Sequence, residues 1–147
     1  MAQESATHDV IVNAQLHSEI QLFYARQMQL LDAGDFDNWA LTFAVDGVFA
    51  ANAYPTPVAG RDNIAAAAQK ATVALAEQGL QRRHWLGMLS VESDGGVVRV
   101  TCYALVIETP RAGVPSLRHS TVCTDELHRS GGEWVVRKRY VQRDDLN

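Results

Sequence analysis

Two histidines lie in segments whose side chains alternate between polar and apolar, and imidazole is the side chain best suited to proton transfer near neutral pH. His84 alternates with Arg82, Leu86, Met88 and Ser90, and His119 alternates with Thr121, Cys123, Asp125 and Leu127. Between them, Tyr103 alternates with Arg99, Thr101, Leu105 and Ile107. Because alternate strand residues share a face, these three faces each combine polar groups with apolar walls. We assign them to the concave side of a curved sheet, with the proviso that one β-bulge reverses the alternation beyond it.

Two imidazoles with a carboxylate to orient or charge one of them form a minimal general acid/base set. The alternative is that each histidine is structural and hydrogen-bonded within the core. A metal site from His84, His119 and Asp125 is a weaker alternative, because the chain lacks the usual spacings of metal ligands. There is also no Gly-x-Ser-x-Gly motif and no glycine-rich phosphate loop. We therefore expect neither a metal nor a nucleotide cofactor.

The elements that must position these residues form an α+β pattern. Residues 1–13 are polar and aperiodic, which predicts a flexible arm. Helical spacing covers 14–31, Asp35 is a suitable N-cap for a second short helix, and an alanine-rich helix spans 63–78. The expected strands are bounded by turn residues and cover 48–53, 82–92, 97–109, 117–129 and 133–143, with Tyr54-Pro55-Thr56-Pro57 as an irregular loop.

The last four strands run to roughly ten residues or more, about twice the usual length. Long strands in a twisted sheet must curl, and helices placed across a curled sheet enclose a cone-shaped cavity. Cavities of that kind bind small molecules. The alanine-rich helix is expected to allow close packing on the sheet rather than to carry chemistry.

Composition and net charge narrow the kinds of molecule that the protein is expected to bind. The chain has 147 residues and a net charge of −4, which suits one domain, 14–147, and argues against binding a nucleic-acid backbone. No apolar stretch approaches the about 20 residues of a membrane span, and the first residues do not resemble a signal peptide. The two cysteines, Cys102 and Cys123, are too few for a disulfide scaffold. These features predict a cytoplasmic protein with reduced thiols.

Several stretches resemble a known family. They are Phe23-Tyr24-Ala25, Leu31-Asp32-Ala33-Gly34-Asp35-Phe36-Asp37-Asn38-Trp39, Phe43 to Phe49, Gly60 to Ile64, and Asp125 to Trp134 with Arg139. Together they are similar to SnoaL-like proteins of the nuclear transport factor 2-like superfamily, which includes ketosteroid isomerases and scytalone dehydratase. The resemblance covers about residues 15 to 143. These motifs are specific for the fold of the superfamily, but they are less specific for the reaction that a member catalyses.

The resemblance implies a cone-shaped α+β barrel, with a curved antiparallel or mixed sheet closed by three N-terminal helices, and a homodimer formed through the sheet. The resemblance places Asp32 at the position where dehydratases of the superfamily carry a catalytic aspartate. It places His84 at the position of the histidine that these enzymes carry on a strand, and His119 near the position of a second histidine. Arg139 resembles a pocket arginine. The ketosteroid isomerase base and tyrosine positions fall on Ala51 and Gln27, which disfavours that mechanism.

The hypothesis that follows is a cofactor-independent cyclase, dehydratase or isomerase acting on an apolar, oxygenated small molecule such as a polyketide or aromatic intermediate. Asp32 and His84 would form the acid/base pair, and His119 or Tyr24 would stabilise an oxyanion or protonate a leaving hydroxyl. Tyr24, Tyr54, Met88, Tyr103, Asp125 and Arg139 would bind the substrate. The alternative is a non-catalytic accessory subunit whose cavity is filled or only binds a ligand.

Overall fold

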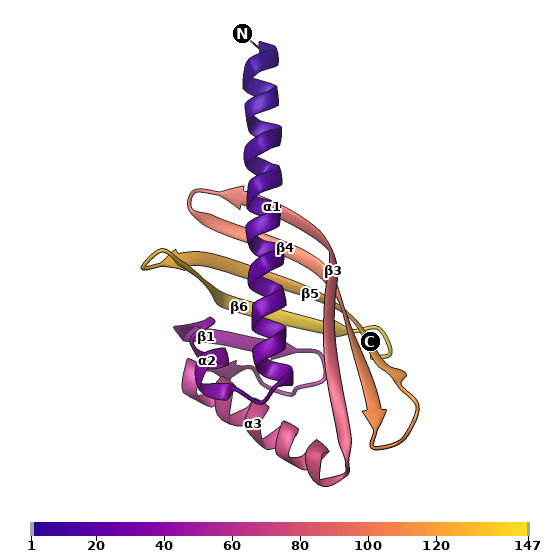
Figure 1. Ribbon diagram of the computed structural model, residues 1–147. Helices are drawn as coiled ribbons and strands as arrows, with labels where there is room; N and C mark the ends of the chain where they lie inside the picture. Colours follow the sequence, from indigo (N-terminus) through magenta and orange to yellow (C-terminus); the bar gives the residue numbers. More distant parts are fainter. Residues whose placement is uncertain (1, 147) are drawn as a thin grey trace.

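A computed structural model describes the backbone of residues 2–146 and the side chains of residues 13–146 (Figure 1). It contains helices, a two-residue strand and five longer strands. In chain order these are α1 (Ala2–Asp32), α2 (Phe36–Ala40), β1 (Phe43–Ala51), β2 (Val58–Ala59), α3 (Arg61–Glu77), β3 (Leu80–Asp94), β4 (Val97–Pro110), β5 (Ser116–Ser130) and β6 (Glu133–Arg143). Within the described chain this is an α+β fold with three helices, as predicted.

The strands form one six-stranded mixed sheet in the order β2-β1-β6-β5-β4-β3. Strand β1 runs parallel to β6, and every other neighbouring pair is antiparallel. The prediction of a cone-shaped barrel is confirmed in part: the sheet is mixed and three helices accompany it, but the sheet is not closed, because β2 and β3 lie at its opposite edges and do not pair. The sheet instead curves around α1, which crosses its inner face (Figure 1).

The length of the strands, 15 residues in β3 and β5 and 14 in β4, confirms the prediction of a long-stranded sheet. A bulge interrupts β3, where the pairing with β4 shifts between Gly87 and Ser90 and Met88 takes a positive φ of 55°. Beyond this bulge the alternation reverses, so that Leu89 and Val91 pack against the core while Met88 and Ser90 face outward.

A glycine after α1 and a capping aspartate before α2 mark where these two helices end and begin. Gly34, with φ of 76°, follows α1, and the Asp35 carboxylate accepts a hydrogen bond from the Asn38 backbone N–H at 3.3 Å to cap α2. The backbone of α1 is helical from Ala2, where the sequence predicts an arm. The side chains of residues 1–12 and the whole of residue 147 lie outside the described residues, so the flexibility of that arm stays a prediction.

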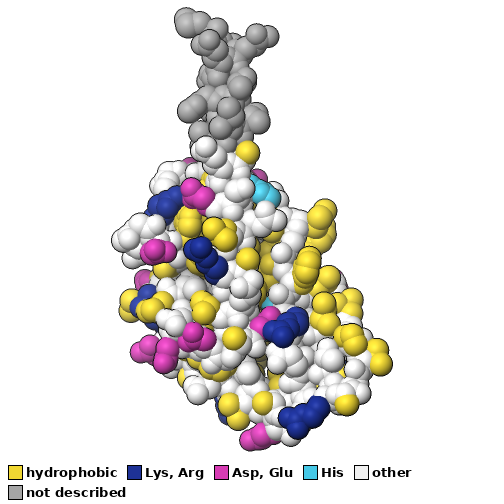
Figure 2. Space-filling model, viewed as in Figure 1, with side chains coloured by type: hydrophobic (Ala, Val, Ile, Leu, Met, Phe, Trp, Pro, Cys, Tyr) yellow, Lys and Arg dark blue, Asp and Glu magenta, His cyan; other side chains and the backbone are white. Residues whose placement is uncertain are grey.

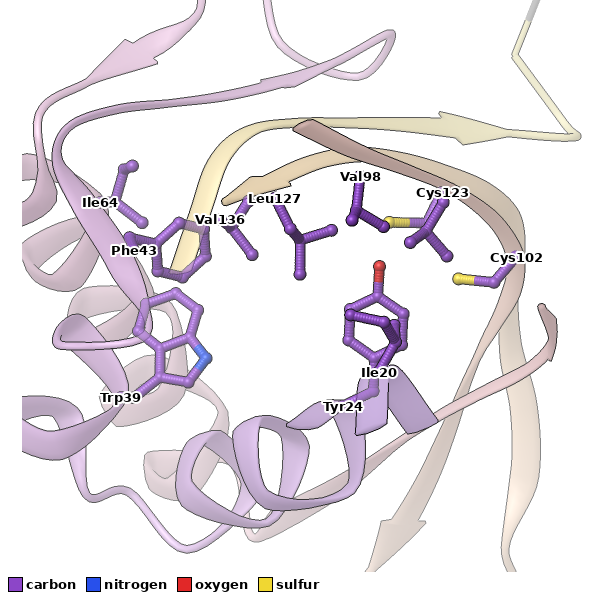
Figure 3. Close-up of a cluster of buried hydrophobic side chains, with 11 residues drawn as sticks. Ile20, Tyr24, Trp39, Phe43, Ile64, Val98, Cys102, Cys123, Leu127 and Val136 are labelled. Carbon is purple, nitrogen blue, oxygen red and sulfur yellow. The ribbon is translucent and has the colours of Figure 1, made fainter. Parts of the chain in front are cut away.

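The hydrophobic core lies between α1, α2 and the inner face of the sheet (Figure 3). Ile20, Phe43, Leu127 and Val136 are fully buried, and the Trp39 and Phe43 rings meet edge to face with centroids 4.9 Å apart. This packing fixes α1 across the sheet and thereby sets where its C-terminal end lies. No helix in the described part of the chain has both the length and the hydrophobicity needed to span a membrane.

Candidate active site

A cavity of about 360 Å³ lies between the C-terminal end of α1, the inner face of α3, β1 and the first residues of β3. Its wall is mostly apolar. The lining residues are Leu31, Asp32, Ala33, Gly34, Trp39, Phe49, Tyr54, Val58, Ile64, Ala67, Ala68, Ala71, Thr72, Leu75, Ala76, Leu80, Gln81, Arg82 and His84. Helix α3 contributes four alanines to this wall, so the alanine-rich segment leaves room for a ligand as well as allowing close packing.

Asp32 and His84 meet at this cavity, as the resemblance implies. The imidazole Nδ1 of His84 lies 2.6 Å from Asp32 Oδ1, and the backbone N–H of His84 donates to Asp32 Oδ2 at 3.0 Å. The Asp32 side chain is 7% exposed and that of His84 is 27% exposed. Because the carboxylate accepts from both groups, it selects the Nδ1–H tautomer of a neutral imidazole. The Nε2 atom makes no hydrogen bond to any described residue and is available to a ligand.

The position of Asp32 is costly for the helix that carries it. A helix C-terminus bears partial negative charge, so a carboxylate on the last residue of α1 is electrostatically unfavourable there. Two hydrogen bonds from His84 offset this cost. Gln81 adds a third link between the elements, since its Nε2 donates to the backbone carbonyl of Asp32 at 3.2 Å. The arrangement fixes the end of α1 against the start of β3.

Arg82 is a cavity residue that the sequence did not single out as a site residue. Its Nε donates to Glu108 Oε2 at 2.8 Å, and the two side chains are 26% and 16% exposed. This ion pair leaves other guanidinium N–H groups of Arg82 able to donate towards the cavity. The signal was present in the sequence, because Arg82 lies two residues before His84 and therefore on the same face of β3.

Tyr24, Asp125 and Arg139 come together, but in the core rather than at the cavity. Arg139 binds both oxygens of Asp125, through Nε at 2.9 Å and Nη2 at 2.8 Å. The Tyr24 hydroxyl donates to Asp125 at 2.6 Å, and Gln27 accepts from Arg139 at 2.7 Å. We call these four residues the buried network. It contains none of the cavity-lining residues, and Gln27 is a member that the sequence did not identify.

Burial sets the protonation of the buried network. Desolvation, with the negative charge of Asp125, raises the pKa of Tyr24 well above its ordinary value, so the phenol stays protonated and acts as a donor. Although burial works against a charged guanidinium, the Asp125 carboxylate raises the pKa of Arg139. The network therefore holds one compensated ion pair with a neutral phenol beside it, and it joins α1 to β5 and β6.

Two further predicted substrate-binding residues, Met88 and Tyr103, do not line the cavity. Met88 is 79% exposed and Tyr103 is 56% exposed, and both lie on the outer face of the sheet. The bulge in β3 turns Met88 outward. On β4 the inner face is the purely apolar one, with Val98, Val100 and Cys102, so a mixed polar pattern was the wrong criterion for that strand. Tyr54, in the loop after β1, does line the cavity.

His119 lies on the inner face of β5, as predicted, but outside the cavity lining. It pairs with Val106, which pairs with His84, so the two imidazoles share one row across the sheet. Burial, and then the positive charges of Arg143, Arg82 and Arg118, lower the pKa of His119. No three potential metal ligands gather among the described residues, so His84, His119 and Asp125 do not form the alternative metal site.

The SnoaL-like domain profile matches residues 13–140. No curated protein matches the chain. Among solved structures, Aln2 from a Streptomyces species is 35% identical, with 89% of this chain and 92% of that chain covered and a TM-score of 0.82. ActVI-ORFA from Streptomyces coelicolor is 31% identical, with 90% and 99% covered and the same TM-score of 0.82. A Catenulispora acidiphila protein solved in complex with S-DNPA is 33% identical, with 90% and 96% covered and a TM-score of 0.78.

Proposed function

The chain belongs to the SnoaL-like family of the nuclear transport factor 2-like superfamily, and from this premise we propose that it is a cofactor-independent acid/base enzyme. Its reaction would be a cyclisation, dehydration or isomerisation of an apolar, oxygenated small molecule. The observation that carries the proposal is the hydrogen-bonded Asp32–His84 pair in the wall of an apolar cavity. A cavity that only stores or buries an apolar ligand has no need of such a pair.

The pair supports one proton-transfer step. Asp32 holds the Nδ1–H of His84, so the Nε2 lone pair removes a proton from a carbon next to a carbonyl group of the substrate. The carboxylate then stabilises the imidazolium that forms, as in other histidine–carboxylate pairs. The imidazolium returns this proton to a leaving hydroxyl in a dehydration, or to another carbon in an isomerisation. No redox partner is needed in either case.

Arg82 would stabilise the enolate oxygen formed in that step. Glu108 fixes its guanidinium through Nε, and a fixed positive charge near a developing oxyanion lowers the barrier. Tyr24, which the sequence placed in this role, donates instead to Asp125 in the core. His119 remains a second candidate acid or donor. Its lowered pKa favours a neutral imidazole, which still carries one N–H donor.

The substrate class follows from the cavity wall and from the relatives. The wall is mainly alanine, leucine, isoleucine and aromatic side chains, which suits a molecule with few charges. S-DNPA, the ligand of the Catenulispora acidiphila protein, is the first compound to test, together with aromatic polyketide intermediates. We place the reaction in the cytoplasm, where the two buried free cysteines would stay reduced.

The test separates binding from turnover. Purified protein is first mixed with S-DNPA and with a panel of aromatic polyketides, and the melting temperature of each mixture is measured. Compounds that stabilise the protein are then incubated with wild type and with His84→Ala, and the products are analysed by mass spectrometry. We expect turnover by wild type and its loss in the variant. Stabilisation without turnover in either protein would favour a non-catalytic binding subunit, and equal turnover in both proteins would show that His84 is not the base.

We also propose that two copies of the chain pair through the outer face of the sheet. Exposed apolar side chains gather on that face, namely Trp85, Met88, Tyr103, Leu117 and Tyr140. In Figure 2 hydrophobic side chains extend along the right-hand side of the molecule, over the long strands. Sedimentation analysis should give a dimer for wild type and a monomer for Trp85→Glu with Tyr103→Glu. A wild-type monomer at micromolar concentration would contradict this pairing.

A further inference from the structure

Helix α3 presents one hydroxyl group, that of Thr72, to the cavity. The residues of α3 that line the cavity recur three or four positions apart, so they share one face of the helix. Apart from Thr72 they are all apolar, namely Ile64, Ala67, Ala68, Ala71, Leu75 and Ala76. We propose that Thr72 is a specificity-determining residue of the site, and that its hydroxyl forms a hydrogen bond with an oxygen substituent of the substrate.

The Thr72 hydroxyl is free to bind a ligand. A threonine within a helix often donates to the carbonyl group four residues earlier, which here belongs to Ala68. The structure contains no such bond, and no other described residue binds Oγ1 of Thr72. In the described part of the chain, Trp39 Nε1 and His128 Nδ1 are the side-chain atoms that are both enclosed and without a partner. The unpaired Oγ1 of Thr72 is therefore accessible, and a hydroxyl can both donate and accept.

The fold itself does not require a hydroxyl at this position. Thr72 lies one turn after Ala68 and one turn before Ala76, and threonine is a poorer helix former than alanine. Alanine would continue the row, and valine would keep the shape of the side chain, and either would leave this face of α3 wholly apolar. The small side chains on both sides also leave room for a ligand to reach Oγ1. Contact with a ligand thus accounts for Thr72 better than packing does.

This inference rests on the proposed function and adds a requirement on its substrate. Asp32, Arg82 and His84 contribute polar groups from the end of α1 and the start of β3, whereas Thr72 contributes its hydroxyl from α3. A molecule whose single oxygen lies near His84 leaves the Thr72 hydroxyl unused. The substrate should therefore carry at least two oxygen substituents, the second of which is a hydroxyl, carbonyl or ether group next to α3.

The test compares ligands that differ by one hydroxyl group. The affinities of wild type for 2-naphthol and for the 1,6-, 2,3-, 2,6- and 2,7-dihydroxynaphthalenes are measured by calorimetric titration. These isomers place the second hydroxyl at different points of the cavity. We expect at least one isomer to bind about 2- to 10-fold more tightly than 2-naphthol, which is the effect of one further hydrogen bond. If wild type prefers no isomer over 2-naphthol, the inference is overturned.

Variants then show whether Thr72 makes that bond. Thr72→Val removes the hydroxyl and keeps the shape of the side chain, so it should abolish the preference with little change in the affinity for 2-naphthol. Thr72→Ser restores a hydroxyl and should restore the preference. Thr124→Val is the matched control and should keep it, since Thr124 is exposed and lies outside the cavity lining. Thr72→Ala is a second variant without the hydroxyl, and it serves where valine disturbs the packing of α3.

A preference that survives in both Thr72→Val and Thr72→Ala would contradict the role of Thr72. These measurements concern binding alone. Their failure is therefore distinguishable from that of the proposed reaction, which depends on whether His84→Ala retains turnover.

Discussion

His84 binds the carboxylate of Asp32 twice, through its imidazole Nδ1 at 2.6 Å and through its own backbone N–H at 3.0 Å. The backbone contact fixes the carboxylate relative to β3, and the ring contact then fixes the imidazole relative to the carboxylate. The orientation of the imidazole therefore depends on secondary structure as well as on side-chain packing. A site on rigid elements is better preorganised than one on loops.

Asp32→Asn should fold normally and lose turnover by about 10²- to 10⁴-fold. The amide still accepts from the His84 backbone N–H, but it no longer stabilises an imidazolium, and its NH₂ can hold the ring in the Nε2–H tautomer. Turnover of a stabilising ligand, followed by chromatography, measures the loss. Asp35→Asn is the matched control, because Asp35 lies three residues away and an asparagine there still caps α2. Full activity of Asp32→Asn would remove the proposed mechanism.

Arg139→Met should reduce the free energy of unfolding by about 3–5 kcal/mol, because it leaves Asp125 charged and buried without its partner. Urea denaturation followed by circular dichroism measures the change. The double variant Arg139→Met with Asp125→Leu should recover much of the loss, since it removes both buried charges. Equal losses in the single and double variants would show that packing, and not the uncompensated charge, sets the cost.

Alternation along the strands predicted the inner face of β5 correctly, from His119 through Leu127. The pairing of this stretch with β4 is regular, and the register shift between Glu126 and Leu127 adds its extra residue to β6 and not to β5. Alternation failed at Met88, where a bulge inserts one residue, and a bulge has no reliable local signature in a single sequence. It failed at Tyr103 for a different reason. A polar face with Tyr and Thr is compatible with a cavity or with an outer surface, and only the packing of α1 decides between them.

The Asp32–His84 pair shows the same limit. Asp32 and His84 are separated by 52 positions, and only the resemblance to a family joined them before the structure did. Arg139 and Asp125 were both identified, yet residue types alone could not distinguish a polar pocket from a compensated ion pair in the core. Tyr24 and Gln27, on α1, hydrogen-bond to Asp125 and Arg139, and these contacts make the pair a compensated ion pair in the core and not part of a polar pocket.

Tyr24→Phe should reduce stability at neutral pH by about 1.5–3 kcal/mol, the value of a hydrogen bond to a charged group. Its pH dependence should also change. Tyrosine in an unfolded chain ionises near pH 10, whereas burial and Asp125 raise the pKa of Tyr24 in the folded state. The folded protein thus retains the proton longer, and stability falls as the pH rises above about 10.

Denaturation curves from pH 8 to 11 test this dependence. Wild type should lose stability more steeply than Tyr24→Phe above pH 10, and Tyr54→Phe, at an exposed loop position, should follow wild type. If wild type and Tyr24→Phe have the same slope, then Tyr24 does not carry the alkaline sensitivity.

His119→Gln should make the protein less sensitive to acid. Burial and the positive charge of Arg143 lower the pKa of His119 in the folded state, so the unfolded chain binds a proton first as the pH falls below about 6.5. Wild type therefore loses stability between pH 7 and 5, and the variant should lose less. Melting temperatures across that range measure the difference, with His17→Gln as a control for the removal of a histidine. Identical acid profiles in wild type and His119→Gln would contradict this account.

Ala71→Leu should reduce the affinity for fused-ring ligands while leaving the Asp32–His84 pair intact. Ala71 lies on the face of α3 that lines the cavity, and a leucine there would occupy space that a second or third ring needs. Overpacking of this kind costs about 1–3 kcal/mol, which corresponds to about 5- to 160-fold in affinity. Ala74→Leu, on the same helix but outside the cavity lining, is the matched control. Calorimetric titration with 2-naphthol and with phenol separates the effects, because the single ring of phenol should still bind. Equal losses for both compounds would show that α3 does not set the size of the ligand.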